Sequence, residues 1–230
     1  QQGCSVAYSH MAATVYNNRA YVIGGLDKQV GIECQVYTSE NNSWLFEFPS
    51  LPKGRFNSVC FVYRDSLYVF GGTDNSSNMN EIVRYDLSTQ NSGEWTTIAK
   101  VNEANQRGGV AFVVEDKVYA GLGEKSNGIR NGFYVSSDSL TKWELIPSIP
   151  AQLGVISSGV YDEQKKSFFM IDNDGKIWEY NLTTEQWTSR SLWIRMKNYH
   201  MFMLDGSIYI LGQDIYQKNK FTVYNPIWDN

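Results

Sequence analysis

Few side chains in this sequence have the chemistry for metal binding or catalysis. The chain of 230 residues contains two histidines, His10 and His200, and three cysteines. A metal site needs several histidine, cysteine or carboxylate ligands that converge on one point. The two histidines are far apart in the sequence, and each lies near the start of an apolar run. We interpret them as two unrelated polar residues at the start of β-strands, and we predict neither a metal nor a cofactor.

Other signatures of catalysis are missing from the sequence too. The glycine pairs end apolar runs and open no helix, so they do not form phosphate-binding loops. A serine nucleophile elbow is absent. Cys60 lies in the apolar run SVCFVY and is expected to be a small buried hydrophobe. A bridge between Cys4 and Cys34 is an alternative, but free thiols are the favoured interpretation.

Composition limits the classes of partner. The sequence is 42% hydrophobic and 14% aromatic, with a formal net charge of −4. It contains no block of lysine and arginine, which argues against binding to nucleic acid or to an anionic membrane. No apolar run is long enough to span a bilayer, and the first residues do not form a signal peptide. The localisation is left between a cytoplasmic protein and the mature form of an exported one.

The chain is organised as an internal repeat. The phrase DSLYVFGG, from Asp65 to Gly72, returns as NRAYVIGG, DKVYAGLG and GSIYILGQ. Each copy follows another β-like run and precedes a tyrosine and then a tryptophan. Successive tryptophans of the repeat stand 51, 48, 44 and 41 residues apart. A period of about 40–50 residues with several short strands is typical of propeller blades.

Within each unit, two polar residues such as Asn17 and Asn18 join the first two apolar runs, which predicts a tight β-hairpin. Glycine at the end of a strand indicates the close approach of another backbone. We therefore assign a structural role to the glycine pairs and to the tryptophans, whose replacement by alanine should cost about 3–5 kcal/mol. These repeat positions are Gly24, Gly25, Gly71, Gly72, Trp44, Trp95, Trp143 and Trp187.

This pattern resembles the kelch-repeat β-propeller family, whose motif is a strand ending in Gly-Gly, then a tyrosine, then a tryptophan. The third unit has a degenerate copy, and the fourth replaces the glycine pair by Ile171, Asp172 and Asn173. The resemblance implies one all-β propeller domain over residues 1–230, and the five repeat units favour five four-stranded blades, with a trimmed fragment or one unrecognised blade as the alternative. Their approximate ranges are 10–52, 55–100, 107–150, 153–192 and 196–230, with residues 3–8 as the strand that closes the ring.

In kelch-like rings the start of each first strand faces one mouth of the central channel. By this resemblance Arg55 and Arg107 stand at equivalent positions of adjacent blades and could bind the carboxylates of an acidic ligand. The alternative is that both arginines brace neighbouring loops through backbone carbonyls. Closure of the ring would also bring the two histidines to this mouth. The predicted binding residues are Tyr8, His10, Arg55, Asn57, Arg107, Tyr199 and His200.

The favoured function is a non-catalytic, monomeric binding module that presents its loops to a protein, a peptide or a glycan. The longer loops, residues 26–33, 73–80 and 124–131, are the expected contacts. A second hypothesis is a sugar-active enzyme resembling the kelch-type sialic-acid mutarotases, with Arg55 or Arg107 as anchor. Its base would be one of three glutamates, Glu33, Glu81 or Glu103. A third is a purely structural part of a larger protein.

Overall fold

The computed structural model describes residues 8–45, 48–89, 92–193, 196–214 and 216–224. In this part of the chain, strands form five antiparallel sheets, four of them four-stranded and the last three-stranded. Two short 3₁₀ helices, η1 (Leu87–Thr89) and η2 (Asn102–Ala104), lie beside the strands of the second sheet. None of the described helices is long and apolar enough to cross a membrane.

The strands follow one another in chain order within each sheet. The first sheet contains β1 (Ala12–Tyr16), β2 (Arg19–Ile23), β3 (Cys34–Thr38) and β4 (Ser43–Leu45). The second contains β5 (Val59–Tyr63), β6 (Ser66–Phe70), β7 (Glu81–Asp86) and β8 (Thr96–Lys100). The third contains β9 (Val110–Val114), β10 (Lys117–Gly121), β11 (Phe133–Ser136) and β12 (Glu144–Leu145). The fourth contains β13 (Ile156–Asp162), β14 (Ser167–Asp172), β15 (Lys176–Asn181) and β16 (Gln186–Trp193), and the fifth contains β17 (Lys197–Leu204), β18 (Ser207–Gln213) and β19 (Asn219–Tyr224).

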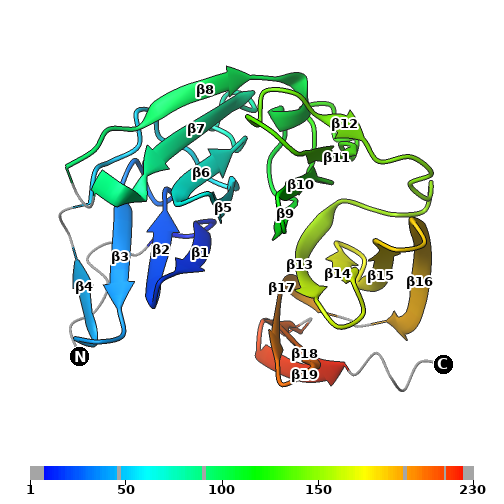
Figure 1. Cartoon of the computed structure of the whole chain (residues 1–230). Coiled ribbons are helices and arrows are strands. Elements are labelled where there is room, and N and C mark those ends of the chain that lie inside the picture. The colour runs from blue at the N-terminus through cyan, green and yellow to red at the C-terminus, as the bar shows by residue number, and fades with distance from the viewer. Residues whose placement is uncertain (1–7, 46–47, 90–91, 194–195, 215, 225–230) are drawn as a thin grey trace.

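The sheets are the blades of a five-bladed β-propeller, which confirms the predicted all-β fold. The first strand of each blade lies nearest the axis, and the fourth strands of the first four blades lie outermost (Figure 1). The predicted fourth strand of the last blade falls on residues 225–230, outside the described residues. The predicted closing strand, residues 3–8, also lies outside them except for Tyr8, which belongs to no strand. Ring closure by that segment stays a prediction.

Two-residue turns build the predicted hairpins. Strands β1 and β2 pair from Tyr16 and Arg19 onward, and the residues between them, Asn17 and Asn18, have φ values of 48° and 58°. Arg64 and Asp65 join β5 to β6 with φ values of 47° and 53°. Two consecutive left-handed residues form a turn whose twist matches that of the strands. These hairpin turns all lie at the same end of the channel.

The glycine pairs join neighbouring blades. Gly25 N donates to Arg55 O at 2.9 Å, and Gly72 N donates to Gln106 O at 2.8 Å. A Cβ atom on Gly24 would lie 2.3 Å from the same Arg55 carbonyl oxygen, so no other residue fits there. In the fourth blade, Asp172 takes the place of the pair. Its carboxylate accepts hydrogen bonds from Trp178 Nε1 at 2.9 Å and from the backbone N–H of Lys176.

The half-buried tryptophans of three blades pack toward the preceding blade. Trp95 Nε1 donates to Pro49 O at 2.9 Å. The ring centroid of Trp143 lies 5.3 Å from that of Phe70, and the ring of Trp187 lies 5.9 Å from that of Phe133. Apolar side chains fill the spaces between blades, including the free thiols Cys34 and Cys60. Burial raises the pKa of both thiols, that of Cys34 to about 12.

Among the described residues, the last blade buries its large apolar side chains mainly on one face. Met201, Ile208 and Ile210 pack against the fourth blade. On the opposite face, the ring of Tyr209 stacks between Phe202 and Phe221 at centroid distances of 5.2 and 5.4 Å. The large hydrophobic side chains exposed on this face are Phe202, Leu204, Leu211, Phe221 and Val223.

Candidate functional site

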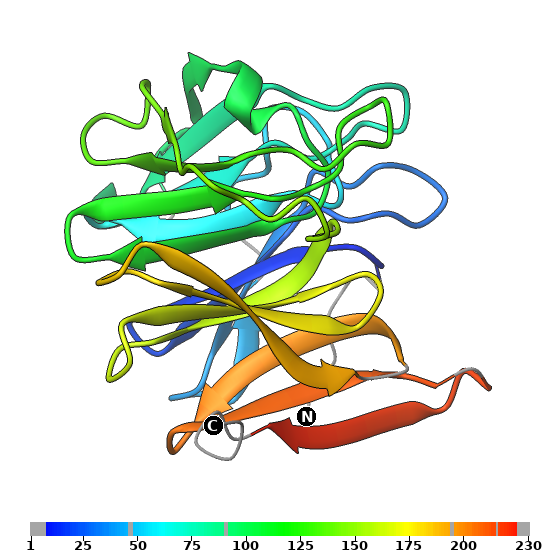
Figure 2. The same ribbon diagram turned by 90° about the vertical axis from the view of Figure 1, so that its right-hand side faces the viewer.

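Side chains from all five blades line a cavity of about 710 Å³ at the channel end where each first strand begins. The long connections between the second and third strands project on this side of the ring (Figure 2). We call this cavity the long-loop mouth. Its polar lining residues are Ser9, His10, Asn57, Ser58, Arg107, Glu124, Asn173, Asn198, Tyr199 and His200.

Left-handed residues mark the start of four blades at this mouth. His10, Asn57, Gly108 and Asn198 have φ values of 58°, 49°, 67° and 54°. Asn57 N donates to His10 O at 2.9 Å, and Gly108 N donates to Asn57 O at 2.6 Å. Equivalent residues of successive blades are thus hydrogen bonded to one another, and all four line the long-loop mouth.

One ion pair crosses the rim of the cavity. Arg107 Nε and Nη2 donate to the two carboxylate oxygens of Glu124 at 3.2 and 2.9 Å. The side chains are 47% and 30% exposed, so both remain accessible to a ligand. Because Glu124 neutralises Arg107, the mouth carries a balanced charge at this point rather than a free cation. The sequence interpretation identified Arg107 but missed Glu124, the first residue of a predicted contact loop.

The structure brings the two histidines to the same cavity. His10 and His200 both line the long-loop mouth, as the closed-ring interpretation of the sequence implied. His10 Nδ1 lies 2.9 Å from Ser9 Oγ, and its ring meets the edge of Phe56 at 6.1 Å. Within the described part of the chain, no group of three or more histidine, cysteine or carboxylate side chains could hold a metal.

Ser58 adds a buried polar group that sequence reasoning missed. It lines the cavity and is 8% exposed, and its hydroxyl has no hydrogen-bond partner among the described residues. A buried hydroxyl without a partner costs free energy, and a bound water, ion or ligand would offset that cost. Its place directly after Asn57, a predicted binding residue, is the signal that could have identified it.

Arg55 does not belong to this cavity. Its guanidinium is fully buried, donates to Gly71 O at 3.2 Å and pairs with Glu81 at 3.4 Å. Burial lowers the pKa of Arg55 from its ordinary value. Arg55 therefore fits the alternative interpretation, in which the arginine braces neighbouring loops through backbone carbonyls.

The two arginines are also not equivalent, and that prediction was wrong. The carbonyls that accept hydrogen bonds from the glycine pairs belong to Arg55 and Gln106. Arg107 is one residue further along. Gln106 occupies the buried position, and its Oε1 accepts a hydrogen bond from Gly123 N at 3.1 Å.

The two predicted tyrosines occupy different places. Tyr199 lines the cavity but is 2% exposed, and its hydroxyl accepts a hydrogen bond from Met196 N at 3.1 Å. Tyr8 lies against Gly31, outside the lining of the cavity. Burial, and then a hydrogen bond to Glu33, raises the pKa of Tyr8.

The predicted catalytic glutamates do not converge on the long-loop mouth. None of Glu33, Glu81 and Glu103 lines the cavity. Glu33 accepts a hydrogen bond from Ile32 N, and Glu81 pairs with Lys100 at 3.2 Å as well as with Arg55. The carboxylate that does reach the cavity, Glu124, is already paired with Arg107.

A comparison with protein families agrees with this repeat geometry. The family model described as the KLHDC2/KLHL20/DRC7 Kelch-repeats domain matches residues 2–153. The chain belongs to this kelch-repeat family. The resemblance expected from the Gly-Gly, tyrosine and tryptophan pattern is thereby confirmed.

Individual kelch proteins are similar at lower identity. Kelch-like protein 36 of Mus musculus is 27% identical over 165 residues, which cover 66% of this chain and 26% of the mouse protein. Kelch repeat and BTB domain-containing protein 1 of ectromelia virus (strain Moscow) is 25% identical over 227 residues, covering 93% of this chain and 39% of the viral protein. The chain therefore spans well under half the length of these two relatives.

A solved structure supports the kelch fold independently. The structure titled "Structure of YjhT" superposes with a TM-score of 0.76 at 16% sequence identity, over 95% of this chain and 84% of that one. At this identity the likeness shows the fold alone.

Proposed function

We propose that this kelch propeller is a non-catalytic binding module that holds a segment of a partner protein at the long-loop mouth. The observation that carries the proposal is the convergence of polar side chains from five blades on one cavity. A propeller holds such groups on rigid strands, so they lose little conformational entropy when a ligand binds.

The chemistry of the mouth favours a peptide segment. Asn57 and Asn198 offer amide donors and acceptors, and Ser58 offers a hydroxyl without a partner. Arg107 and Glu124 offer a cation and an anion side by side. Alternating donors and acceptors of this kind match the N–H and C=O groups of an extended backbone.

A glycan is less well matched, because sugars usually stack on an exposed aromatic ring. Among the described lining residues, the tyrosine at this mouth is buried and the other rings are those of His10 and His200. The predicted contact loops would extend the surface around the cavity, with Glu124 at the start of one of them.

The proposal can be tested by selecting peptides from a displayed random library on the whole chain. Selected peptides are then measured on the Arg107→Ala and Arg64→Ala variants. Arg64 is a matched control because it is also an exposed arginine in an ion pair, with Asp116 at 3.6 Å, and it lies at the opposite channel end. Loss of one interfacial charge should weaken binding about tenfold in Arg107→Ala and leave it unchanged in Arg64→Ala.

Two results would overturn the proposal. One is a selection that enriches no peptide on the wild-type chain. The other is a set of peptides that bind Arg107→Ala as tightly as the wild type. Peptides that lose affinity only in Arg64→Ala would place binding at the other end of the channel and count against the long-loop mouth.

A further inference from the structure

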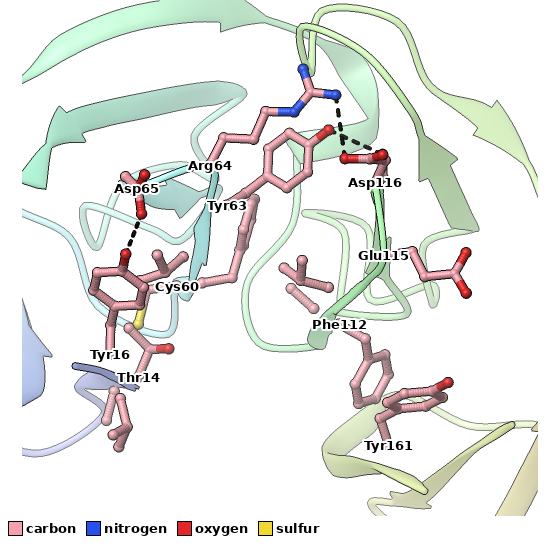
Figure 3. Close-up of a pocket in the computed structure, with 16 residues that line it drawn as sticks. Thr14, Tyr16, Cys60, Tyr63, Arg64, Asp65, Phe112, Glu115, Asp116 and Tyr161 are labelled. Atoms are coloured by element: carbon pink, nitrogen blue, oxygen red, sulfur yellow. Dashed lines mark hydrogen bonds and ion pairs between the residues drawn. The ribbon is translucent and has the colours of Figure 1, made fainter. Parts of the chain in front are cut away.

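A second cavity, of about 540 Å³, lies at the hairpin end of the channel (Figure 3). Its walls are the inner strands β1, β5 and β9, and Tyr161 from β13 also lines it. We call it the hairpin mouth. Its rim residues are Tyr16, Tyr63, Arg64, Asp65, Glu115, Asp116 and Tyr161.

The rim of the hairpin mouth carries an excess of negative charge. Asp65, Glu115 and Asp116 contribute three carboxylates, all on exposed residues, and Arg64 contributes the one cation among the lining residues. They come from the hairpin turns of the second and third blades, which hold them on short, rigid connections. Carboxylates clustered at a concave opening attract a cationic ligand and repel nucleic acid.

Aromatic rings lie beside these carboxylates. The Arg64 guanidinium lies 4.8 Å from the centroid of the Tyr63 ring and pairs with Asp116 at 3.6 Å. This internal contact shows how a guanidinium fits between a tyrosine face and a carboxylate at this rim. Tyr161 presents a further ring next to Phe112 (Figure 3), and burial, followed by the charges of Glu163 and Glu115, raises the pKa of its hydroxyl.

Hydrogen bonds hold two rim tyrosines in place. The Tyr16 hydroxyl donates to the Asp65 carboxylate, and the Tyr63 hydroxyl donates to Asp116 O at 3.0 Å (Figure 3). The bond to Asp65 raises the pKa of Tyr16, and burial raises that of Tyr63. Both phenols therefore stay neutral at physiological pH and add no charge of their own.

The interior of the cavity is apolar beneath this rim. Ala13, Val62, Ala111 and Val113 line it from three neighbouring inner strands, together with Phe112. A ligand that fits must therefore combine positive charge at the rim with an apolar group that can enter the channel.

We propose that the hairpin mouth binds a basic segment of a partner protein, in which arginine or lysine meets the rim carboxylates and a neighbouring apolar side chain enters the channel. The rim carboxylates favour a basic residue by charge complementarity, and the apolar wall of the cavity favours an apolar residue next to it. This site is independent of the long-loop mouth, since the two cavities share only Ala13 among their lining residues.

The probe is a fluorescent synthetic peptide of alternating arginine and leucine, compared with one of alternating glutamate and leucine. Binding to the whole chain is followed by fluorescence anisotropy. The test variant is Glu115→Gln/Asp116→Asn. The matched control is Glu94→Gln/Glu144→Gln, which changes net charge equally at exposed residues away from the cavity. Thermal unfolding of both variants checks that they fold as the wild type does.

We expect the arginine–leucine peptide to bind and the glutamate–leucine peptide not to bind. The test variant should lose about tenfold in affinity, while the control should stay within about twofold. A peptide of alternating arginine and glycine should bind about fivefold more weakly, because it lacks the apolar side chain.

Three results would overturn the proposal. Equal losses in the test and control variants would mean that only overall charge matters. Equal binding of the arginine and glutamate peptides would remove the electrostatic argument. Equal binding of the leucine and glycine peptides would remove the apolar one.

Discussion

The two ends of the channel are built by the same repeat and yet differ in chemistry. At the long-loop mouth, the cation Arg107 is neutralised by Glu124, and most other polar lining groups are amides, hydroxyls and imidazoles. At the hairpin mouth, three carboxylates face one guanidinium. One end is suited to hydrogen bonding with a neutral chain, and the other to attraction of a basic one.

The difference follows from how the blades are connected. Long loops at one end allow distant side chains such as those of Arg107 and Glu124 to meet. The hairpin turns that border the other mouth hold only two residues each, so their charged side chains stay close together at its rim. Fixed strands with variable connections can therefore give one propeller two unlike surfaces.

The largest expected difference between the two ends is in how much one arginine at each end contributes to stability. Arg55 is fully buried behind the long-loop mouth, whereas the Arg64 side chain is 57% exposed at the hairpin mouth. Arg55→Met leaves the carboxylate of Glu81 without its buried partner and should lower the free energy of unfolding by about 3 kcal/mol. Arg64→Met should lower it by less than about 1 kcal/mol. Urea denaturation of both variants measures this difference, and equal losses would contradict the assignment of Arg55 as a structural brace.

A matched pair of glycine substitutions tests whether each mouth binds its ligand independently of the other. Asn57 and Glu115 both have left-handed backbones, with φ values of 49° and 53°. Asn57→Gly and Glu115→Gly therefore remove a side chain from opposite mouths and should leave stability nearly unchanged. Each should cost about 1 kcal/mol in binding, or about fivefold in affinity, at its own mouth alone. The measurement is the affinity of both variants for long-loop-mouth peptides and for the arginine–leucine peptide. Parallel losses at both mouths would show that the two ends are coupled.

The smallest expected effect is a pH dependence of stability that comes from one aspartate on the long-loop side. Asp74 pairs with Lys53 at 2.7 Å and accepts hydrogen bonds from Ser76 and Ser77. These contacts, the Lys53 one foremost, hold the pKa of Asp74 well below its ordinary value. Because the folded pKa is the lower one, Asp74 stabilises the fold above about pH 4, and this contribution is lost as pH falls further.

Asp74→Asn should therefore flatten the loss of stability in acid. Thermal unfolding of the wild type and the variant between neutral and acidic pH measures the effect. Lys53→Met should reproduce part of it, because it removes the largest contributor. Identical acid profiles for all three proteins would contradict the assignment.

Most of the fold was predictable from the sequence because it depends on short-range residue patterns that recur from blade to blade. Two-residue polar turns, glycine pairs and the tyrosine–tryptophan step each act within a few residues, and five copies in register reinforce one another. The fourth blade kept its place in the fold although Asp172 replaced the glycine pair. Instead of the glycine contacts between blades, the Asp172 carboxylate accepts hydrogen bonds from Trp178 and Lys176 of its own blade.

The candidate site was predictable only in part, because it depends on registers of one residue. Arg55 precedes the first residue of β5 by one position more than Arg107 precedes that of β9. This offset of one residue decides whether the arginine is buried, as Arg55 is, or exposed at the rim of the cavity, as Arg107 is. The pairing of Arg107 with Glu124, and the burial of Ser58, arise from backbone contacts between distant segments, which spacing alone does not reveal.

The exposed face of the last blade affects where unfolding of the protein begins. A propeller is a short array of blades, each stabilised by the blades beside it, and the described strands of the last blade bury fewer side chains than those of the second or fourth blade. Phe202 and Phe221 contribute little to stability there because both side chains are exposed. Fraying should begin in this blade, and its amide protons should exchange with solvent before those of β5 to β7, where most side chains are enclosed on both faces.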